Sequence, residues 1–145
     1  MSIEQASIYI GLKQLREQLF FIQALMSKKD QIRFGTPILD ECRRSLAFFV
    51  MAFSNSERRI EYMDRCIGMF AVLRADIDMC HNHHLIHYPL RKDEKGNKLP
   101  GPEAISSQQI ELSALIGRID SDMLKYHQSL VKGKNIVATD SIRPS

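Results

Sequence analysis

Apolar residues recur at the period of an α-helix along this 145-residue chain, and that periodicity constrains the fold more than any other feature. In the first segment the spacing is four, three, four, three, four, at Ile8, Leu12, Leu15, Leu19, Ile22 and Met26. At about 100° per residue, such a series lies on one face of a helix. The sequence therefore predicts a long amphipathic helix over residues 3–27.

Three further helices are predicted downstream. Thr36 is a favourable N-cap and Pro37 a favourable first helical residue, which predicts a second helix over 37–53. Ser56 is the expected N-cap of the third helix, and Ser106 or Ser107 begins the fourth. The expected apolar stripes are Ile38, Cys42, Leu46, Phe49 and Phe53; then Ile60, Met63, Ile67, Phe70 and Ile77, flanked by Cys66, Leu73 and Cys80; then Leu112, Leu115, Ile116, Ile119, Met123, His127 and Leu130.

Short connections after the first two helices imply antiparallel neighbours. We therefore expect an all-α, up-down-up-down four-helix bundle over residues 1–131. A proline-rich loop at 88–105 separates the third and fourth helices. Residues 132–145 lose the periodicity, which predicts a flexible C-terminal tail.

The composition indicates in which cellular compartment the protein is expected. No apolar run approaches the roughly 20 residues that span a bilayer, and the N-terminus lacks the pattern of a secretory signal. The three cysteines are an odd number, have no paired spacing and fall on apolar stripes, so they are expected to be reduced core thiols. These features favour a cytoplasmic protein.

Two helices carry more apolar surface than one core requires. Ile10, Phe21 and Leu25 lie on a second face of the first helix. The second helix carries Phe48, Met51 and Ala52 beside Arg44. Exposed side chains of this size mark interfaces, so self-association is favoured over the alternative of a wider core.

Basic residues gather at the turn before the second helix and along the second and third helices. The set is Lys28, Lys29, Arg33, Arg43, Arg44, Arg58, Arg59 and Arg65. Such a band fits a phosphate backbone. The alternative is a solvated surface neutralised by neighbouring acids, namely Asp40, Glu41, Glu57, Glu61 and Asp64.

Arg74 falls within the apolar stripe of the third helix and therefore needs a partner. Pairing with an acid from another helix is the simpler interpretation, and a place in a subunit interface is the alternative. His127 is expected to lie on the apolar face of the fourth helix, as a core or interface residue whose hydrogen bonds are satisfied.

No cofactor, metal site or enzymatic activity is predicted. The cluster from Cys80 to His87 offers i,i+4 pairs if the third helix continues, but it lacks the ligand patterns of zinc sites, and capping is the favoured interpretation. The chain has no nucleophile elbow, no glycine-rich phosphate loop and no Glu-x-x-His pattern.

A family resemblance follows from the order of these features. A long first helix precedes a basic turn ending in Gly35, a second helix begins at Ile38, and a break occurs near Asn55. Basic residues open the third helix, which carries Leu73 and Arg74 in its second half. Over about residues 8–86 the chain resembles the four-helix-bundle accessory variability determinants of diversity-generating retroelements. Proteins encoded by intervening sequences of 23S ribosomal RNA share that fold family.

The resemblance implies a barrel-shaped homopentamer that binds a reverse transcriptase and its template RNA during mutagenic cDNA synthesis. The basic set would then face the RNA or the polymerase. Ile10, Phe21, Leu25, Phe48, Met51 and Arg74 would form the subunit interface. The alternative is a helical interaction or structural bundle, of the ribosomal intervening-sequence type, that binds no nucleic acid.

Overall fold

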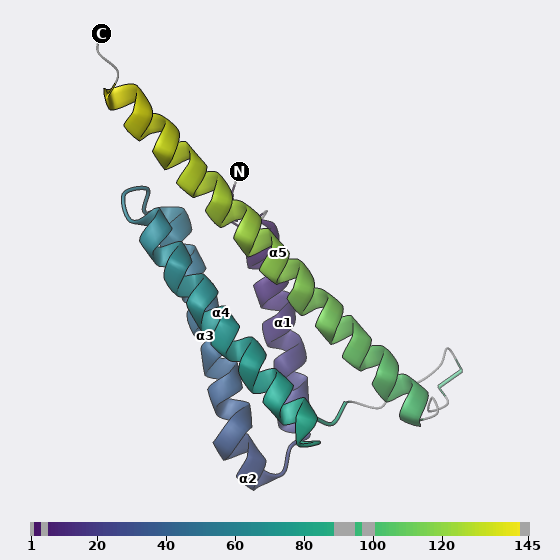
Figure 1. The fold of residues 1–145 in the computed structure, drawn as a ribbon. Coiled ribbons are helices and arrows are strands. Elements are labelled where there is room, and N and C mark those ends of the chain that lie inside the picture. The colour runs from purple at the N-terminus through teal and green to yellow at the C-terminus, as the bar shows by residue number, and fades with distance from the viewer. Residues whose placement is uncertain (1, 4–5, 89–94, 97–100, 143–145) are drawn as a thin grey trace.

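Four long helices pack against one another in the computed structural model, which describes residues 2–3, 6–88, 95–96 and 101–142 and places the side chains of the last helix only over 107–133 (Figure 1). The long helices are α1 (Ser7–Ala24), α3 (Thr36–Ser54), α4 (Arg59–Asn82) and α5 (Gly101–Ile142). They alternate in direction along the bundle. The predicted all-α four-helix bundle is therefore confirmed.

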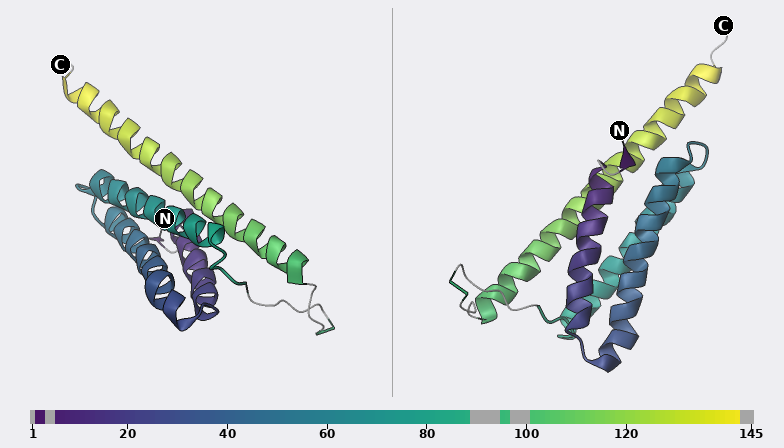
Figure 2. Two further views of the ribbon diagram at one scale, coloured as in Figure 1. Left: turned by 60° about the horizontal axis from the view of Figure 1, so that its bottom comes forward. Right: turned by 180° about the vertical axis from the view of Figure 1, so that it is seen from behind.

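The last helix is the unusual element of the bundle. α1, α3 and α4 run side by side, whereas α5 crosses α1 and α4 obliquely and extends past the turn between α3 and α4 (Figure 2). α5 has 42 residues and α4 has 24. At 1.5 Å per residue these lengths are ~63 Å and ~36 Å, so α5 projects well beyond its neighbours.

The apolar series that opened the sequence forms the inner face of α1 and the turn after it. Ile8, Leu12, Leu15, Leu19, Ile22 and Met26 are all buried. Gly11 lies beside this series, and a Cβ atom there would stand 2.7 Å from Cγ1 of Ile119 on α5. α1 and α5 therefore cross in close contact at a glycine.

The helix predicted over 37–53 corresponds to α3, but an unpredicted helical stretch that begins at Lys28 precedes it, and Thr36 has helical backbone angles and is not an N-cap. Ser27 is the N-cap, its Oγ accepting the N–H of Asp30 at 3.2 Å. α2 (Lys28–Asp30), the π-helical segment η2 (Gln31–Gly35) and α3 follow without a break. Pro37 has no backbone N–H and therefore cannot donate a helical hydrogen bond. The wider π-helical turn of η2, directly before it, lets the helix continue despite this missing bond.

Small side chains line the contact between α3 and α4. Ser45 and Ala52 are fully buried, whereas the predicted stripe residues Leu46 and Phe53 are only half-buried. The Ser45 hydroxyl donates to the Cys66 carbonyl across the contact at 3.1 Å. The core line of α4 accordingly shifts to Cys66, Phe70, Leu73, Ile77 and Cys80, so three residues assigned to its flank belong to its centre.

The ends of α4 also differ from expectation. The side chain of Asn55, and not Ser56, accepts the N–H of Arg58 at 3.1 Å before α4 begins. At the other end α4 stops at Asn82, and His84 has a positive φ of 58°. The helical continuation that would have paired Cys80 with His84, and His83 with His87, is therefore absent.

α5 is longer than predicted at both ends. It begins at Gly101, inside the predicted loop, and continues through residues 132–142, where a flexible tail was expected. Loop residues 89–94 and 97–100 and tail residues 143–145 lie outside the described residues. Among the described helices, none combines the length and hydropathy that crossing a membrane requires.

Candidate nucleic-acid interface

The predicted basic residues lie at both ends of the bundle and between them. Lys28, Lys29 and Arg33 occupy α2 and η2, which follow α1 at one end. Arg58, directly before α4, and Arg59, its first residue, lie at the opposite end, where α3 turns into α4 (Figure 1). The structure therefore places these cations in separate groups along the molecule.

The middle group is organised around a single carboxylate on α3. Asp40 Oδ1 lies 3.1 Å from Arg43 Nη2, and Asp40 Oδ2 lies 2.8 Å from Arg44 Nε. Both arginine side chains remain more than half exposed. Two guanidinium groups share one carboxylate, so the group retains a net positive charge.

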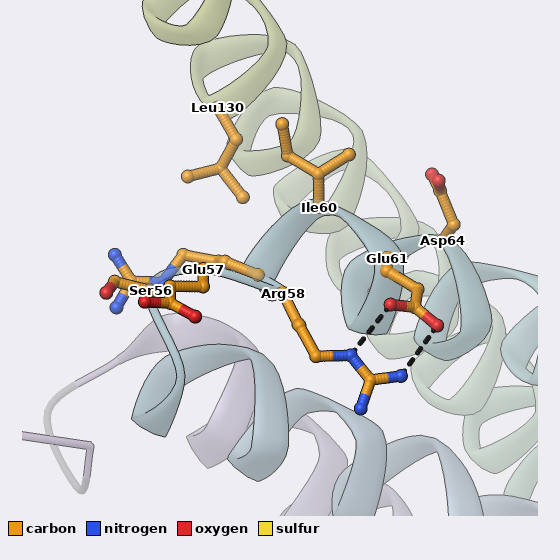
Figure 3. A pocket seen from close by; sticks show the side chains of 8 residues that line it. Ser56, Glu57, Arg58, Ile60, Glu61, Asp64 and Leu130 are labelled. Carbon is orange, nitrogen blue, oxygen red and sulfur yellow. Dashed lines mark hydrogen bonds and ion pairs between the residues drawn. The ribbon is translucent and has the colours of Figure 1, made fainter.

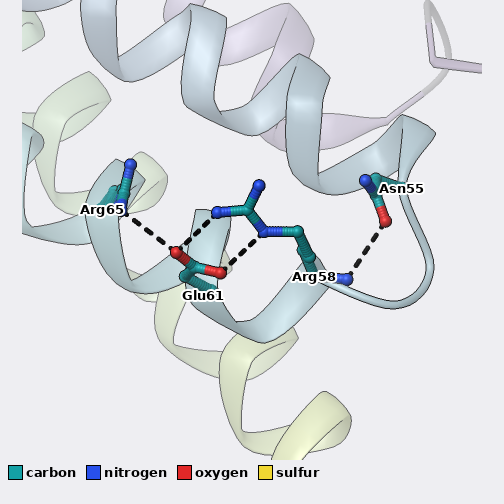
Figure 4. A network of polar contacts seen from close by, with 4 residues as sticks. All are labelled: Asn55, Arg58, Glu61 and Arg65. Carbon is teal, nitrogen blue, oxygen red and sulfur yellow. Dashed lines mark hydrogen bonds and ion pairs between the residues drawn. The ribbon is translucent and has the colours of Figure 1, made fainter.

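A second carboxylate organises the start of α4 (Figure 4). Glu61 accepts two hydrogen bonds from Arg58, each of 2.9 Å, and one of 3.1 Å from Arg65. The bonds from Arg58 lower the pKa of Glu61 below its usual value. The Arg58 guanidinium also lies 4.8 Å from the ring centre of Tyr62. This group, too, retains a net positive charge.

Arg59 has a structural partner of a different kind. Its guanidinium donates to the carbonyls of Ala52 at 2.8 Å and Phe53 at 3.1 Å, in the last turn of α3. The side chain thus satisfies carbonyls that the end of a helix leaves without intrahelical partners. Of the predicted basic residues, Arg59 is therefore the one whose hydrogen bonds most clearly stabilise the fold.

Lys28, Lys29 and Arg33 differ from the other predicted cations. All three are exposed, and none forms an ion pair within the described part of the chain. They lie on one short helical stretch at the end of the bundle. This group, named the α2 cluster below, presents its charge fully to solvent.

The predicted interface residues are scattered over the bundle. Ile10, Phe21, Leu25 and Met51 are 41–51% exposed, so the second face of α1 exists. Of the apolar face predicted on α3, Met51 is exposed, whereas Ala52 belongs to the core and Phe48 packs against that core.

Arg74 and His127 have partners on neighbouring helices. Arg74 pairs with Asp120 of α5 at 3.1 Å, as the simpler interpretation predicted. The imidazole Nε2 of His127 lies 2.6 Å from Oδ1 of Asp64 on α4. Both pairs join α4 to α5.

The histidine cluster after α4 contributes to packing. His81 Nε2 lies 2.6 Å from the Tyr88 hydroxyl, and the two rings are stacked. Burial lowers the pKa of His81 and raises the pKa of Tyr88 to about 12. No group of three or more potential ligand side chains is positioned for a metal ion among the residues that the structure describes.

An open pocket of about 630 Å³ lies beneath the projecting part of α5 (Figure 3). It is lined by Ser56, Glu57, Arg58, Arg59, Ile60, Glu61, Asp64 and Leu130. Ile60 of α4 and Leu130 of α5 approach each other above the turn. Most charged groups at its edge already bind one another or carbonyl oxygens, so the pocket offers little free chemistry to a ligand.

A second hollow lies on the outer side of α1, where it meets α3. It has a volume of about 490 Å³ and is lined by Tyr9, Lys13, Arg16, Glu17, Phe20, Phe21 and Leu46. Of these, the sequence had singled out Phe21 as an interface residue and Leu46 as a member of an apolar stripe. The missed signal is the spacing of Tyr9, Lys13, Arg16 and Phe20, which follows the helical pattern of four, three and four.

A pair of carboxyl groups between α3 and α4 also went unrecognised in the sequence. Glu41 of α3 lies close to the Asp76 carboxyl of α4, and the buried Oε2 atom of Glu41 has no hydrogen-bond partner among the described residues. Burial, followed by the contact with Asp76, raises the pKa of Glu41 to about 8. The raised pKa reduces the negative charge that Glu41 can offer to the neighbouring arginines, a role that the alternative interpretation assigned to it.

Comparison with known proteins gave no match, whether to a family model, to a curated protein or to a solved structure.

Proposed function

We propose that this chain is a non-enzymatic accessory subunit that binds nucleic acid as a homo-oligomeric helical bundle. The observation that carries the proposal is the α2 cluster, in which Lys28, Lys29 and Arg33 are exposed and free of ion pairs within the described residues. Clustered cations of this kind bind phosphates and release condensed counterions. The partner is expected to be a structured RNA.

The two arginine groups extend this surface. Each joins two guanidinium groups to one carboxylate, around Asp40 and around Glu61. Exposed ion pairs of this type contribute only about 0–1 kcal/mol, so exchanging a carboxylate for a phosphate costs little. Arginine then offers a phosphate two parallel hydrogen bonds.

The resemblance to accessory variability determinants suggests the biological role of this binding. In that role the subunit holds a reverse transcriptase and its template RNA during mutagenic cDNA synthesis. The exposed stripe of Ile10, Phe21 and Leu25 would mediate assembly, since apolar patches of this kind mark interfaces.

The second candidate function is a helical interaction bundle without nucleic-acid binding. A specific observation favours it, namely that Asp40 and Glu61 pair with four of the eight predicted cations. The two functions differ in what the α2 cluster does.

A paired substitution tests the proposal. Lys28→Gln with Lys29→Gln is compared with Lys125→Gln with Lys132→Gln, which removes the same charge from exposed positions on α5. Affinity for a fluorescein-labelled RNA stem-loop is measured by anisotropy between 50 and 200 mM salt. Each lost phosphate contact should lower the salt slope by about 0.7–0.9, so the first variant should lose roughly 1–2 in slope and the second none.

Two results would contradict the proposal. The wild-type chain would fail to bind the stem-loop at 50 mM salt, or both double variants would keep the wild-type affinity and slope. The second candidate function predicts the first of these results.

A further inference from the structure

One side of α1 carries two cationic side chains between two aromatic ones, along the groove that it forms with α3. Tyr9, Lys13, Arg16 and Phe20 follow one another at helical spacing, and Leu46 of α3 closes the groove. The rise from Tyr9 to Phe20 is ~16 Å. The α2 cluster is separate from this groove, so its chemistry is additional to that of the proposed phosphate contacts.

Phe20 is the ring of the groove that is open to a ligand, since Tyr9 is half-buried beneath Lys13 and Phe21 belongs to the proposed assembly stripe. Phe20 is 56% exposed and Phe21 is 51% exposed. Their ring centres are 5.7 Å apart and meet edge to face, so the two rings present differently oriented surfaces. Large aromatic side chains left this exposed are unusual unless they contact a partner.

The cations of the groove are equally available. Lys13 Nζ lies 5.3 Å from the ring centre of Tyr9. Neither Lys13 nor Arg16 forms an ion pair within the described residues, although Glu17 also lines the groove. The groove thus combines flat apolar faces with cationic groups that have no carboxylate partner.

We propose that this groove binds unpaired nucleotides of a single-stranded nucleic acid. A base would stack on the Phe20 ring, while Lys13 and Arg16 contact the flanking phosphates. The proposal rests on the proposed nucleic-acid-binding function and adds a second site to it.

The charge and shape of the groove favour this occupant over an apolar protein segment. A single strand carries flat bases beside negative phosphates, and the groove places Phe20 next to the two cations Arg16 and Lys13. The volume of about 490 Å³ lies within the range of about 300–1,000 Å³ found for small-ligand pockets. An apolar helix would cover the rings and leave Lys13 and Arg16 without partners.

The test uses the full-length chain and a fluorescein-labelled 12-nucleotide oligoadenylate, with the duplex of the same strand as a second probe. Phe20→Leu keeps the apolar contact but removes the ring, and Arg16→Gln removes a cation. Because stacking contributes about 1–3 kcal/mol per base, Phe20→Leu should weaken single-strand binding roughly 5-fold to 100-fold. Duplex binding should be unchanged, since paired bases are not free to enter the groove. Lys125→Gln is the charge control, and thermal melting verifies folding.

The outcomes separate this inference from the function on which it rests. If Phe20→Leu and Arg16→Gln bind the single strand like wild type while the α2-cluster variant loses affinity, the groove inference is overturned and the proposed function stands. If the wild type binds neither probe, both are overturned. If Phe20→Leu alters the particle mass in light scattering but not the affinity, the groove is a protein–protein surface and the inference is also overturned.

Discussion

At the scale of single residues, the partner of each charged side chain decides its role. Arg59 donates to the last carbonyls of α3 and supports the turn, whereas Lys28 and Lys29 remain exposed. The three cysteines are buried and free, and burial raises the pKa of the Cys42 thiol to about 12 and of the Cys66 thiol to about 11. Such thiols stay protonated at neutral pH, so they act as small core side chains and not as nucleophiles.

The buried carboxyl of Glu41 makes stability depend on pH. Its pKa is raised to about 8 in the folded state from 4.5, the ordinary value expected in the unfolded chain. Between these values the folded protein binds more protons than the unfolded chain, so stability is fully present below about pH 4.5 and falls as the pH rises towards 8. Glu41→Gln, which needs no proton, should flatten this dependence.

Thermal melting of both proteins between pH 5 and 9 measures the effect. In a chain of this size each 1 kcal/mol moves the melting temperature by about 2–4 °C, so the loss should be resolved. Asp64→Asn, an exposed carboxylate paired with His127, is the control. If the melting temperatures of the wild type and of Glu41→Gln change by the same amount between pH 5 and pH 8, Glu41 is not the source of the pH dependence.

At the scale of elements, the sequence predicted the regular parts and missed the irregular ones. The apolar series of α1 was predicted because large side chains repeat without interruption. On α3 the predicted Ile38, Cys42 and Phe49 are buried, but so are the small residues Ser45 and Ala52, each one position before the predicted Leu46 and Phe53. A pattern of large apolar residues does not reveal these small buried positions. The helical residues 28–35 were missed because Pro37 is typical of a helix start, whereas here the π-helical segment η2 joins α3 to the helical turn before it.

The candidate site was predictable only in part. Arginine and lysine positions can be read from the sequence, but their pairing with Asp40 and Glu61 depends on side-chain geometry. The groove at Tyr9 and Phe20 carried a helical spacing that could have been recognised. Because Glu41 and Asp76 lie on different helices, no local pattern in the sequence predicts their contact.

Two glycines test how closely α1 and α5 pack. A Cβ atom at Gly11 would lie 2.7 Å from Ile119, whereas one at Gly117 would meet nothing within 4 Å. Gly11→Ala should therefore destabilise the bundle by about 1–3 kcal/mol, as overpacking does. Gly117→Ala, at an exposed position within α5, should stabilise it by roughly 0.5–1 kcal/mol.

Urea denaturation followed by circular dichroism gives both free energies of unfolding. The two variants make the same chemical change in helices, so a difference in sign isolates the contact with Ile119. Equal effects of Gly11→Ala and Gly117→Ala would show that α5 does not pack closely on α1.

At the scale of the whole molecule, the fold leaves apolar and cationic surface without an internal partner. Ile10, Phe20, Phe21 and Leu25 expose large side chains on α1, and Ile110 and Leu124 do so on α5. α5 also extends past the α3–α4 turn, away from the body of the bundle. A bundle with these features has surface suited both to assembly and to binding an acidic partner.

Light scattering tests together whether the chain assembles and whether it binds RNA. The mass of the purified particle is measured alone and with a structured RNA, at 50 and at 300 mM salt. The account predicts an oligomer, pentameric if the family resemblance holds, whose mass increases with RNA at low salt and returns to that of the protein at high salt. A monomer whose mass RNA does not change at either salt concentration would contradict it.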